Sequence, residues 1–286
     1  MRECGDCGLI QVQPHPTEPE IRAFRADHPW WEAQPSARSR FADTLNRHLY
    51  RRDLRFIERS VHPSHTVLEL SWAGSPISYA MSERGLAVSS CAHLAIIPAE
   101  SSQLPQFRFA PGSFGAIVAW HALEHVSEPD VMLRSLLESL ARGGRLLLKV
   151  CNGDSWSALI LGDRWAGFDI PRHPFLFRRR SIERLLEGCG YTVLRSSRCS
   201  GLGEAASLAA SLCPRLDPRV RSMRGEGKAR YATAARNLFF GALTAALLPF
   251  ALLEAASGSG ASIMLEACRA GEEHFGEPGA RRGAVP

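Results

Sequence analysis

Hydrophobic and polar positions along the chain alternate between short apolar runs and helical periodicity, a pattern typical of an α/β protein. The apolar runs that predict buried strands are 66–70, 86–90, 114–120, 145–150, 191–195 and 262–267. The amphipathic stretches that predict helices are 20–59, 129–142 and 181–188, and Gly143-Gly144 is expected to end the second of them. Strands and helices in this order predict a Rossmann-like, doubly wound, mostly parallel sheet, with ligands at the carboxyl ends of its strands.

The length of 286 residues favours one principal domain with appendages. The expected segments are a helical N-terminal cap that starts with a cysteine knuckle (1–60), a core (61–200), a helical insert (201–260), a last core strand (261–268) and a disordered tail (269–286). Within the insert, residues 237–253 carry no charge. As one helix they would be slightly shorter than the roughly 30 Å hydrocarbon core of a bilayer. A helical hairpin bent at Pro249, either buried or at a membrane interface, is therefore expected.

Composition adds little about function but indicates the compartment. The net charge of +5 is modest, and basic and aromatic residues do not interleave along one stretch, so no nucleic-acid partner is expected. Eight scattered cysteines without framework spacing favour a reducing cytoplasm. Cys4 and Cys7, followed by Gly8, resemble one knuckle of a zinc ribbon. A structural zinc site needs four ligands and the chain has no second C-x-x-C, so the knuckle is interpreted as half a site without bound metal.

Two blocks of sequence carry the candidate chemistry. Residues 67–75 form a strand and turn where a nucleotide-binding domain places a glycine-rich loop. The block 114–130, which includes Leu123-Glu-His-Val126, and the block 140–148 then follow in order. Together they resemble the class I S-adenosylmethionine-dependent methyltransferases, which implies their seven-stranded fold. The resemblance continues to Leu194, and the N-terminal knuckle suggests a bacterial branch with a zinc-ribbon-like N-terminus.

The resemblance implies which residues meet S-adenosylmethionine. The implied cofactor-binding residues are Glu69, Ser71, Ala73, Gly74, Ser75, Ser90, Trp120 and His121. The alternative for Trp120 is a place in the core. Ser71, Ala73 and Ser75 stand where the family has glycines, and the second strand ends without the acidic residue that accepts hydrogen bonds from the ribose. Losing such an acceptor costs on the order of 1 to 3 kcal/mol. The cofactor is thus either held by a rebuilt loop or lost.

Two functions follow from this pattern. The first is a methyltransferase acting on a small-molecule or lipid-linked acceptor. The alternative is a catalytically inactive methyltransferase-like scaffold at a membrane surface, with peripheral contact through 237–253. A nucleic-acid methyltransferase is a weaker third hypothesis, because His121-Ala-Leu-Glu124 stands where the DNA-amino enzymes of the family have an Asn/Asp-Pro-Pro-aromatic segment.

Few residues qualify as catalytic or substrate-binding groups. His125, after the fourth strand of the family, and His173, in a loop that faces the acceptor in relatives, are the catalytic candidates. Arg172 is the candidate for an anionic substrate, and Asn152 either touches substrate or closes a turn. His125 with Glu124 has a structural alternative, which is to shape the pocket.

Overall fold

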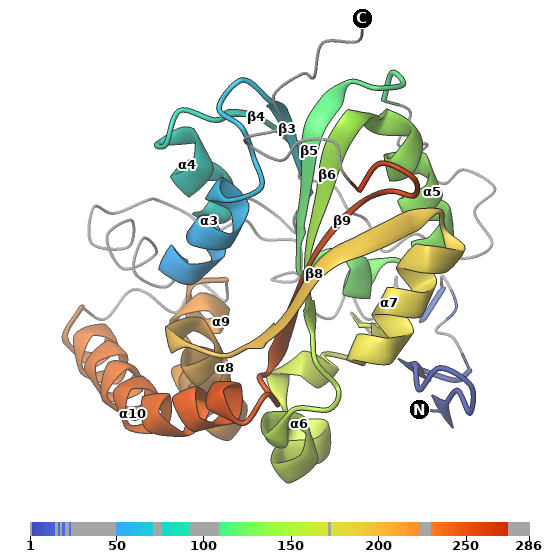
Figure 1. The fold of residues 1–286 in the computed structure, drawn as a ribbon. Coiled ribbons are helices and arrows are strands. Elements are labelled where there is room, and N and C mark those ends of the chain that lie inside the picture. The colour runs from blue at the N-terminus through green and yellow to red at the C-terminus, as the bar shows by residue number, and fades with distance from the viewer. Residues whose placement is uncertain are drawn as a thin grey trace, which may run out of the picture.

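The computed structural model describes residues 2–14, 17, 19–20, 23, 50–70, 76–91, 109–170, 173–223 and 230–273. Most of the predicted N-terminal cap, the turn at 71–75, Arg172 and the tail after residue 273 lie outside the described residues. The remainder forms one sheet with helices on both sides, a small second sheet near the N-terminus, and a helical group at one end (Figure 1).

The main sheet has six strands in the described part of the chain, in the order β4-β3-β5-β6-β9-β8. They are β3 (Thr66–Leu70), β4 (Ala87–Cys91), β5 (Phe114–Trp120), β6 (Leu140–Cys151), β8 (Tyr191–Cys199) and β9 (Ser262–Arg269). The first four in that order are parallel, and β9 runs antiparallel to both β6 and β8. The predicted Rossmann-like α/β fold is confirmed, although a seventh strand is not among the described residues.

Helices cover both faces of the sheet, because the central strands carry apolar side chains on both faces and these must be kept from water. The helices are α3 (Arg51–Glu58) and α4 (Pro76–Ser82) on one face, and α5 (Pro129–Ser139) and α7 (Arg179–Gly188) on the other. The core under α3 and α4 includes Leu54, Ile77 and Val118, and the core under α5 and α7 includes Leu136 and Leu186. These two cores hold the carboxyl ends of β5 and β6 in fixed register.

The N-terminal knuckle belongs to a three-stranded antiparallel sheet, made of β1 (Arg2–Glu3), β2 (Ile10–Gln11) and β7 (Phe175–Leu176). The Cys4 amide donates to the Leu9 carbonyl, and Gly8 takes a φ of 74°, the left-handed region that glycine adopts without strain. The pairing of β2 with β7 attaches the knuckle to the core next to the site described below.

The helical insert packs at the end of the sheet where β5, β6 and β8 finish (Figure 1). It contains α8 (Leu202–Leu212), η5 (Pro214–Leu216), α9 (Pro218–Met223) and α10 (Arg230–Ala256). The predicted hairpin bent at Pro249 is wrong, because α10 is one helix of 27 residues with Pro249 inside it. Both Pro249 and Ala245, the residue four positions earlier, are exposed, so the carbonyl that loses its helical partner lies on the exposed side of the helix, where its loss costs less.

Several predicted boundaries also move. The helix predicted over 129–142 ends at Ser139, and Gly143-Gly144 lies inside β6, with the left-handed φ of 72° at Gly143 accommodated at an irregularity in the β5–β6 pairing. Strand β8 continues to Cys199 rather than ending at Arg195, since its pairing with β9 extends that far. The four remaining short elements are η2 (Leu123–His125), α6 (Trp156–Leu161), η3 (Gly162–Arg164) and η4 (Ala166–Phe168).

Candidate active site

The carboxyl ends of β3, β4 and β5 lie side by side, and this is the end of the sheet where a fold of this kind binds its ligand. Glu69 is the penultimate residue of β3, is 1% exposed, and pairs in register with Ser90 of β4. Strand β4 reads Ala-Val-Ser-Ser-Cys and ends without a carboxylate. Residues Ser71, Ala73, Gly74 and Ser75 lie outside the described residues. A cofactor at this edge therefore finds one acidic side chain, on β3, and none on β4.

Three side chains that each carry an atom able to bind a metal ion lie together at the carboxyl ends of β5 and β6. We call them the histidine cluster: His121, Glu124 and Cys151. His121 Nδ1 lies 3.1 Å from Glu124 Oε1 and 3.7 Å from Cys151 Sγ. Glu124 Oε1 also accepts the Cys151 amide at 2.8 Å, which ties η2 to the end of β6. His121 has a φ of 48°, the one left-handed non-glycine residue in the described part of the chain. The cluster thus sits at a locally unfavourable backbone position.

Electrostatics keeps Glu124 ionised inside the protein. Burial opposes ionisation, but the hydrogen bond and charge of His121, together with the charges of His173 and His125, outweigh it and lower the pKa of Glu124 to about 2. Burial and the neighbouring carboxylate of Glu124 raise the pKa of the Cys151 thiol well above its usual range. His121 is the member of the cluster at the surface, with 37% of its side chain exposed against 0% for Glu124.

The two histidines predicted to be catalytic lie together behind this cluster. The rings of His125 and His173 are 4.6 Å apart in an edge-to-face arrangement, and both residues are buried. His173 Nδ1 is 2.9 Å from the Gly167 carbonyl oxygen, which fixes its ring. Their burial places them beneath the site, whereas His121, predicted only as a cofactor contact, faces outward. The signal that distinguishes these histidines is burial, which the sequence pattern does not give for residues in a loop.

Two further predictions each had an alternative, and the structure favours it. Asn152 was predicted either to contact substrate or to close a turn; it is fully buried, its Oδ1 accepts the Asp154 amide within the turn, and its Nδ2 donates to the Gly260 carbonyl ahead of β9. Trp120 was predicted either to contact the cofactor or to be a core residue; it is 4% exposed in the α3 core and its Nε1 donates to Asp53 at 2.9 Å. Trp120 is therefore a core residue that anchors α3.

A second group of charged residues, which we call the lysine cluster, lies beside the first and consists of Asp53, Lys149 and Glu204. Lys149 Nζ is 2.9 Å from Asp53 Oδ2 and 2.9 Å from Glu204 Oε1. Burial disfavours the ammonium form, but the two carboxylates outweigh it and raise the pKa of Lys149 well above its usual range. Burial likewise opposes the charge on Glu204, yet Lys149 lowers the pKa of Glu204 to about 2. The cluster joins α3, β6 and α8.

The two clusters lie next to each other at the carboxyl ends of the strands, and we call this region the polar edge. The charge of His121 acts on Glu204, and the charge of Glu204 acts on Cys151. The lysine cluster was missed by sequence reasoning because its members are separated by 96 and 55 residues, being numbered 53, 149 and 204. One signal was available, since a lysine directly after Leu146-Leu-Leu148 in a buried strand requires a partner.

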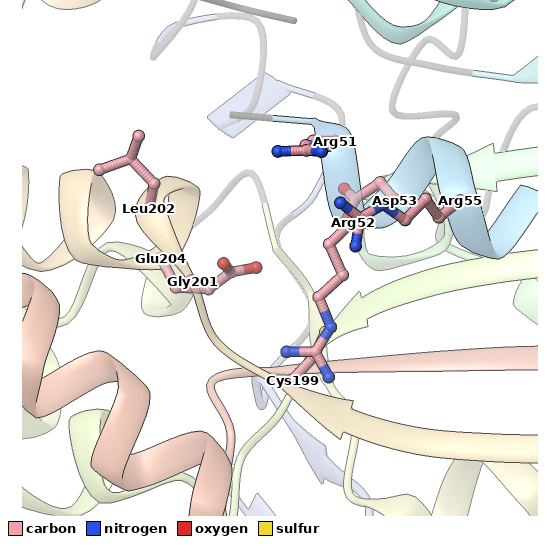
Figure 2. A pocket seen from close by; sticks show the side chains of 8 residues that line it. All are labelled: Arg51, Arg52, Asp53, Arg55, Cys199, Gly201, Leu202 and Glu204. Atoms are coloured by element: carbon pink, nitrogen blue, oxygen red, sulfur yellow. The ribbon is translucent and has the colours of Figure 1, made fainter. Parts of the chain in front are cut away.

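A pocket of about 190 Å³ opens between the first turns of α3 and α8. Its lining residues are Arg51, Arg52, Asp53, Arg55, Cys199, Gly201, Leu202 and Glu204. Figure 2 shows Glu204 reaching from α8 toward α3, and Arg52 extending from α3 toward Cys199. Burial raises the pKa of the Cys199 thiol to about 12, so this wall of the pocket is uncharged at neutral pH. The volume suits a small polar group rather than a whole large ligand.

The knuckle at the N-terminus has the local geometry of a metal-binding turn but two cysteines. Backbone amides of Cys7 and Asp6 donate to the Cys4 sulfur and lower the pKa of Cys4. Within the described residues, no third histidine, cysteine or carboxylate joins them in a ligand group. The prediction of half a site stays a prediction.

Comparison with known proteins identifies a family for the greater part of the chain. Residues 41–196, more than half of the chain, match the model of a family described as a methyltransferase domain. Among solved structures, the [4+2]-cyclase SpnF is 17% identical, with 91% of this chain and 98% of that chain covered and a TM-score of 0.45.

Two solved methyltransferases are similarly distant. One from Archaeoglobus fulgidus, described as dependent on S-adenosylmethionine, is 13% identical, with 77% of this chain and 93% of that chain covered and a TM-score of 0.47. Phosphoethanolamine N-methyltransferase 2 from Haemonchus contortus, solved with S-adenosyl-L-methionine, is 12% identical, with coverages of 87% and 60% and a TM-score of 0.49. The comparison with curated proteins gives no match.

Proposed function

Because the chain belongs to the family of methyltransferase domains, we propose that it transfers a methyl group from S-adenosylmethionine to a small or lipid-linked acceptor at a membrane surface. The observation that carries this proposal is the family match over 41–196, which spans β3 to β8 and so includes the polar edge at the ends of β3, β5 and β6. The described residues fit the cofactor at β3, where Glu69 supplies the carboxylate that the family uses.

The cofactor supplies an electrophilic methyl group, so the protein must mainly hold an acceptor atom in line with it. Glu69 would hold the cofactor from β3. On the acceptor side, His121 contributes an exposed ring that Glu124 holds in place by the hydrogen bond at 3.1 Å. The pocket between α3 and α8 offers an acceptor three arginines at its rim, Arg51, Arg52 and Arg55, which favour an anionic headgroup.

A calorimetric titration with S-adenosylmethionine and S-adenosylhomocysteine tests the cofactor. Micromolar binding is expected, and Glu69→Gln is expected to weaken it by about 10-fold, because a charge-assisted hydrogen bond contributes on the order of 1.5 kcal/mol. Glu58→Gln on the exposed end of α3 is the matched control and should bind as the wild type does. Absence of binding at millimolar ligand would contradict the proposal and favour the scaffold alternative.

The membrane part of the proposal is supported by α10. One helical segment in the described chain, Thr233–Ala256, is long and apolar enough to cross a bilayer, and only 17% of its most apolar window is buried. Its large exposed apolar side chains come in two pairs of neighbours 14 residues, or about four helical turns, apart, so they lie on one side of the helix. These are Leu238, Phe239, Leu252 and Leu253 of α10; α6, which touches the end of α10 through Trp156 and Phe250, exposes Leu159 and Ile160, and we call these six residues the apolar patch. An exposed patch of this kind marks an interaction site.

The structure favours a helix lying on a membrane over one crossing it. Glu254, near the end of α10, is fully buried and accepts hydrogen bonds from Ser157 and Ser200. Near its start, Asn237 accepts from Arg221 of α9. Both ends of α10 are thus attached to the same domain, and β9 follows immediately in the sheet. In Figure 1, α6 and α10 lie at the end of the molecule where β5 and β6 finish, beside the proposed active site.

Charge supports an anionic lipid surface as the occupant. The chain from 215 to 236, which leads into and begins α10, has seven basic residues and two acidic ones, Asp217 and Glu226. An apolar helix face with basic residues at one end is the arrangement that binds anionic lipid interfaces. The free state of the seven described cysteines agrees with a cytoplasmic face.

Vesicle flotation tests the membrane surface. The protein is expected to float with vesicles of phosphatidylcholine and phosphatidylserine, and less with phosphatidylcholine alone. Leu238→Gln combined with Leu252→Gln should lower the floated fraction several-fold, since the two substitutions remove apolar side chains from the apolar patch. The control is Leu194→Gln, an equally apolar exposed residue on β8 outside the patch. Equal flotation of all three proteins would contradict the proposal.

A further inference from the structure

His121, Glu124 and Cys151 present three different ligand atoms at one point. Their Nδ1, carboxylate oxygen and Sγ atoms all lie within 4.8 Å of one another. His121 takes its left-handed backbone while its amide donates to the Lys149 carbonyl at 2.8 Å. A non-glycine residue held in this region costs on the order of 1 kcal/mol, and such positions concentrate at functional sites. The backbone bears this cost at the position where the imidazole meets the other two groups.

The two separations that involve His121 are close to the edges of a metal coordination tetrahedron, and the third, between the Glu124 carboxylate and Cys151 Sγ, is within 4.8 Å. Zinc binds nitrogen and oxygen at roughly 2.0 to 2.1 Å and thiolate at roughly 2.3 Å, which places neighbouring ligand atoms about 3.4 Å apart for nitrogen and oxygen, and about 3.6 Å for nitrogen and sulfur. The observed distances are 3.1 Å from His121 Nδ1 to Glu124 Oε1 and 3.7 Å to Cys151 Sγ. A tetrahedral site needs about 3.6 Å between the Glu124 oxygen and Cys151 Sγ as well, so side-chain rotations of up to about 1 Å would bring the three ligand atoms to coordination distance.

Glu124 supplies an independent observation. Its side chain is fully buried, and its Oε2 has no hydrogen-bond partner among the described residues. A buried carboxylate oxygen without a donor is costly unless a cation or another donor completes it. One carboxylate and one thiolate also balance the charge of a divalent cation, with the imidazole neutral.

We propose that His121 Nδ1, the Glu124 carboxylate and Cys151 Sγ bind one divalent transition-metal ion, Zn²⁺ by the softness and geometry of the ligands. On binding, the Cys151 thiol gives its proton to solvent, and the His121 ring changes tautomer, losing the Nδ1 proton to solvent and taking one from solvent on Nε2, so that Nδ1 is free to bind the metal. Three protein ligands leave the fourth position open, as in catalytic rather than structural zinc sites. Since 37% of the His121 side chain is exposed, solvent or a ligand can reach the cluster from that side.

The role of the open position rests on the proposed function. A water molecule or an acceptor oxygen bound there would sit at the carboxyl ends of β5 and β6, where a methyl acceptor is expected in this fold. The metal would orient that oxygen and favour its deprotonated form. The site is separate from the knuckle of Cys4 and Cys7, which belongs to the small N-terminal sheet.

Cobalt titration tests the site, with Co²⁺ as the spectroscopic substitute for zinc. The full chain carries Cys4→Ser and Cys7→Ser, so that the knuckle contributes no thiolate. One equivalent of Co²⁺ is expected to bind, with a near-ultraviolet thiolate-to-cobalt charge-transfer band. Adding Cys151→Ser should abolish that band, and His121→Gln should weaken cobalt binding by at least about 10-fold. Cys213→Ser, the matched partly exposed cysteine, should retain both.

Three results would overturn the proposal: no charge-transfer band in the Cys4→Ser/Cys7→Ser protein, a band that survives Cys151→Ser, or unchanged cobalt affinity in His121→Gln. Circular dichroism of each variant excludes loss of fold as the cause. Titration of the same protein with S-adenosylmethionine separates the two hypotheses. Cofactor binding without cobalt binding refutes the metal site alone, and cobalt binding without cofactor binding refutes the proposed function alone.

Discussion

The lysine cluster and the histidine cluster are neighbours at the same edge of the sheet, yet they differ in how completely their groups are paired. In the lysine cluster the ammonium lies between two carboxylates at 2.9 Å each, and Glu204 also accepts from Ser262. In the histidine cluster one oxygen of Glu124 has no hydrogen-bond partner in the part of the chain that the structure describes, and His121 has a left-handed backbone. A saturated cluster stabilises the fold, whereas an incomplete and strained one indicates a binding site.

The largest expected loss of stability comes from removing the ammonium group of the lysine cluster. Lys149→Met leaves the carboxylates of Asp53 and Glu204 buried without their cation, and is expected to lower the free energy of unfolding by about 3 to 5 kcal/mol. Urea denaturation followed by circular dichroism measures it. Arg179→Met, which removes an exposed pair with Glu183 on α7, is the control and should cost no more than about 0.5 kcal/mol. Equal losses in the two variants would mean that the lysine cluster is not a structural element.

A loss of stability of intermediate size is expected at acidic pH. The pKa of Glu204 is lowered from 4.5 to about 2 in the folded protein, so its ionised form adds stability that is fully present above about pH 4.5. That stability, on the order of 3 kcal/mol, is lost as the pH falls from about 4.5 toward 2. Glu204→Gln should therefore reduce the dependence of the urea midpoint on pH in this window, leaving the part due to Glu124, whose pKa is lowered to a similar value. The partly exposed Glu183→Gln should leave the dependence unchanged, and a dependence in Glu204→Gln as steep as that of the wild type would contradict the assignment.

These clusters also show how far the sequence reaches. The six strands follow from continuous apolar runs, and the resemblance drew attention to His121, Glu124 and His125 because they come directly after β5. Which of them faces outward was not predictable, since the loop has no periodicity from which burial can be read. The role of Asp53 and Glu204 could not be predicted from the sequence, because only the tertiary packing of α3 and α8 brings them to Lys149.

Helix α10 illustrates the opposite error, in which a local rule was applied too strongly. Proline usually ends or kinks a helix, so Pro249 predicted a hairpin. In the structure, Glu254 anchors the last turns of α10 to Ser157 and Ser200, and η5 and α8 pack along the helix. Tertiary contacts at both ends outweigh the single backbone hydrogen bond that the proline removes.

The smallest expected effect concerns the backbone of His121. Replacement by alanine keeps the left-handed conformation and removes the bond to Glu124, whereas replacement by glycine removes the same bond and relieves the backbone. The glycine variant should therefore be more stable than the alanine variant by about 1 kcal/mol, measured by urea denaturation with a chelator present. The matched pair is Ala122→Gly against wild type, at a residue with a φ of −113°, where glycine should instead be the less stable. If His121→Gly is no more stable than His121→Ala, the backbone is unstrained, and the contrast between an incomplete binding cluster and a saturated structural one loses its conformational support.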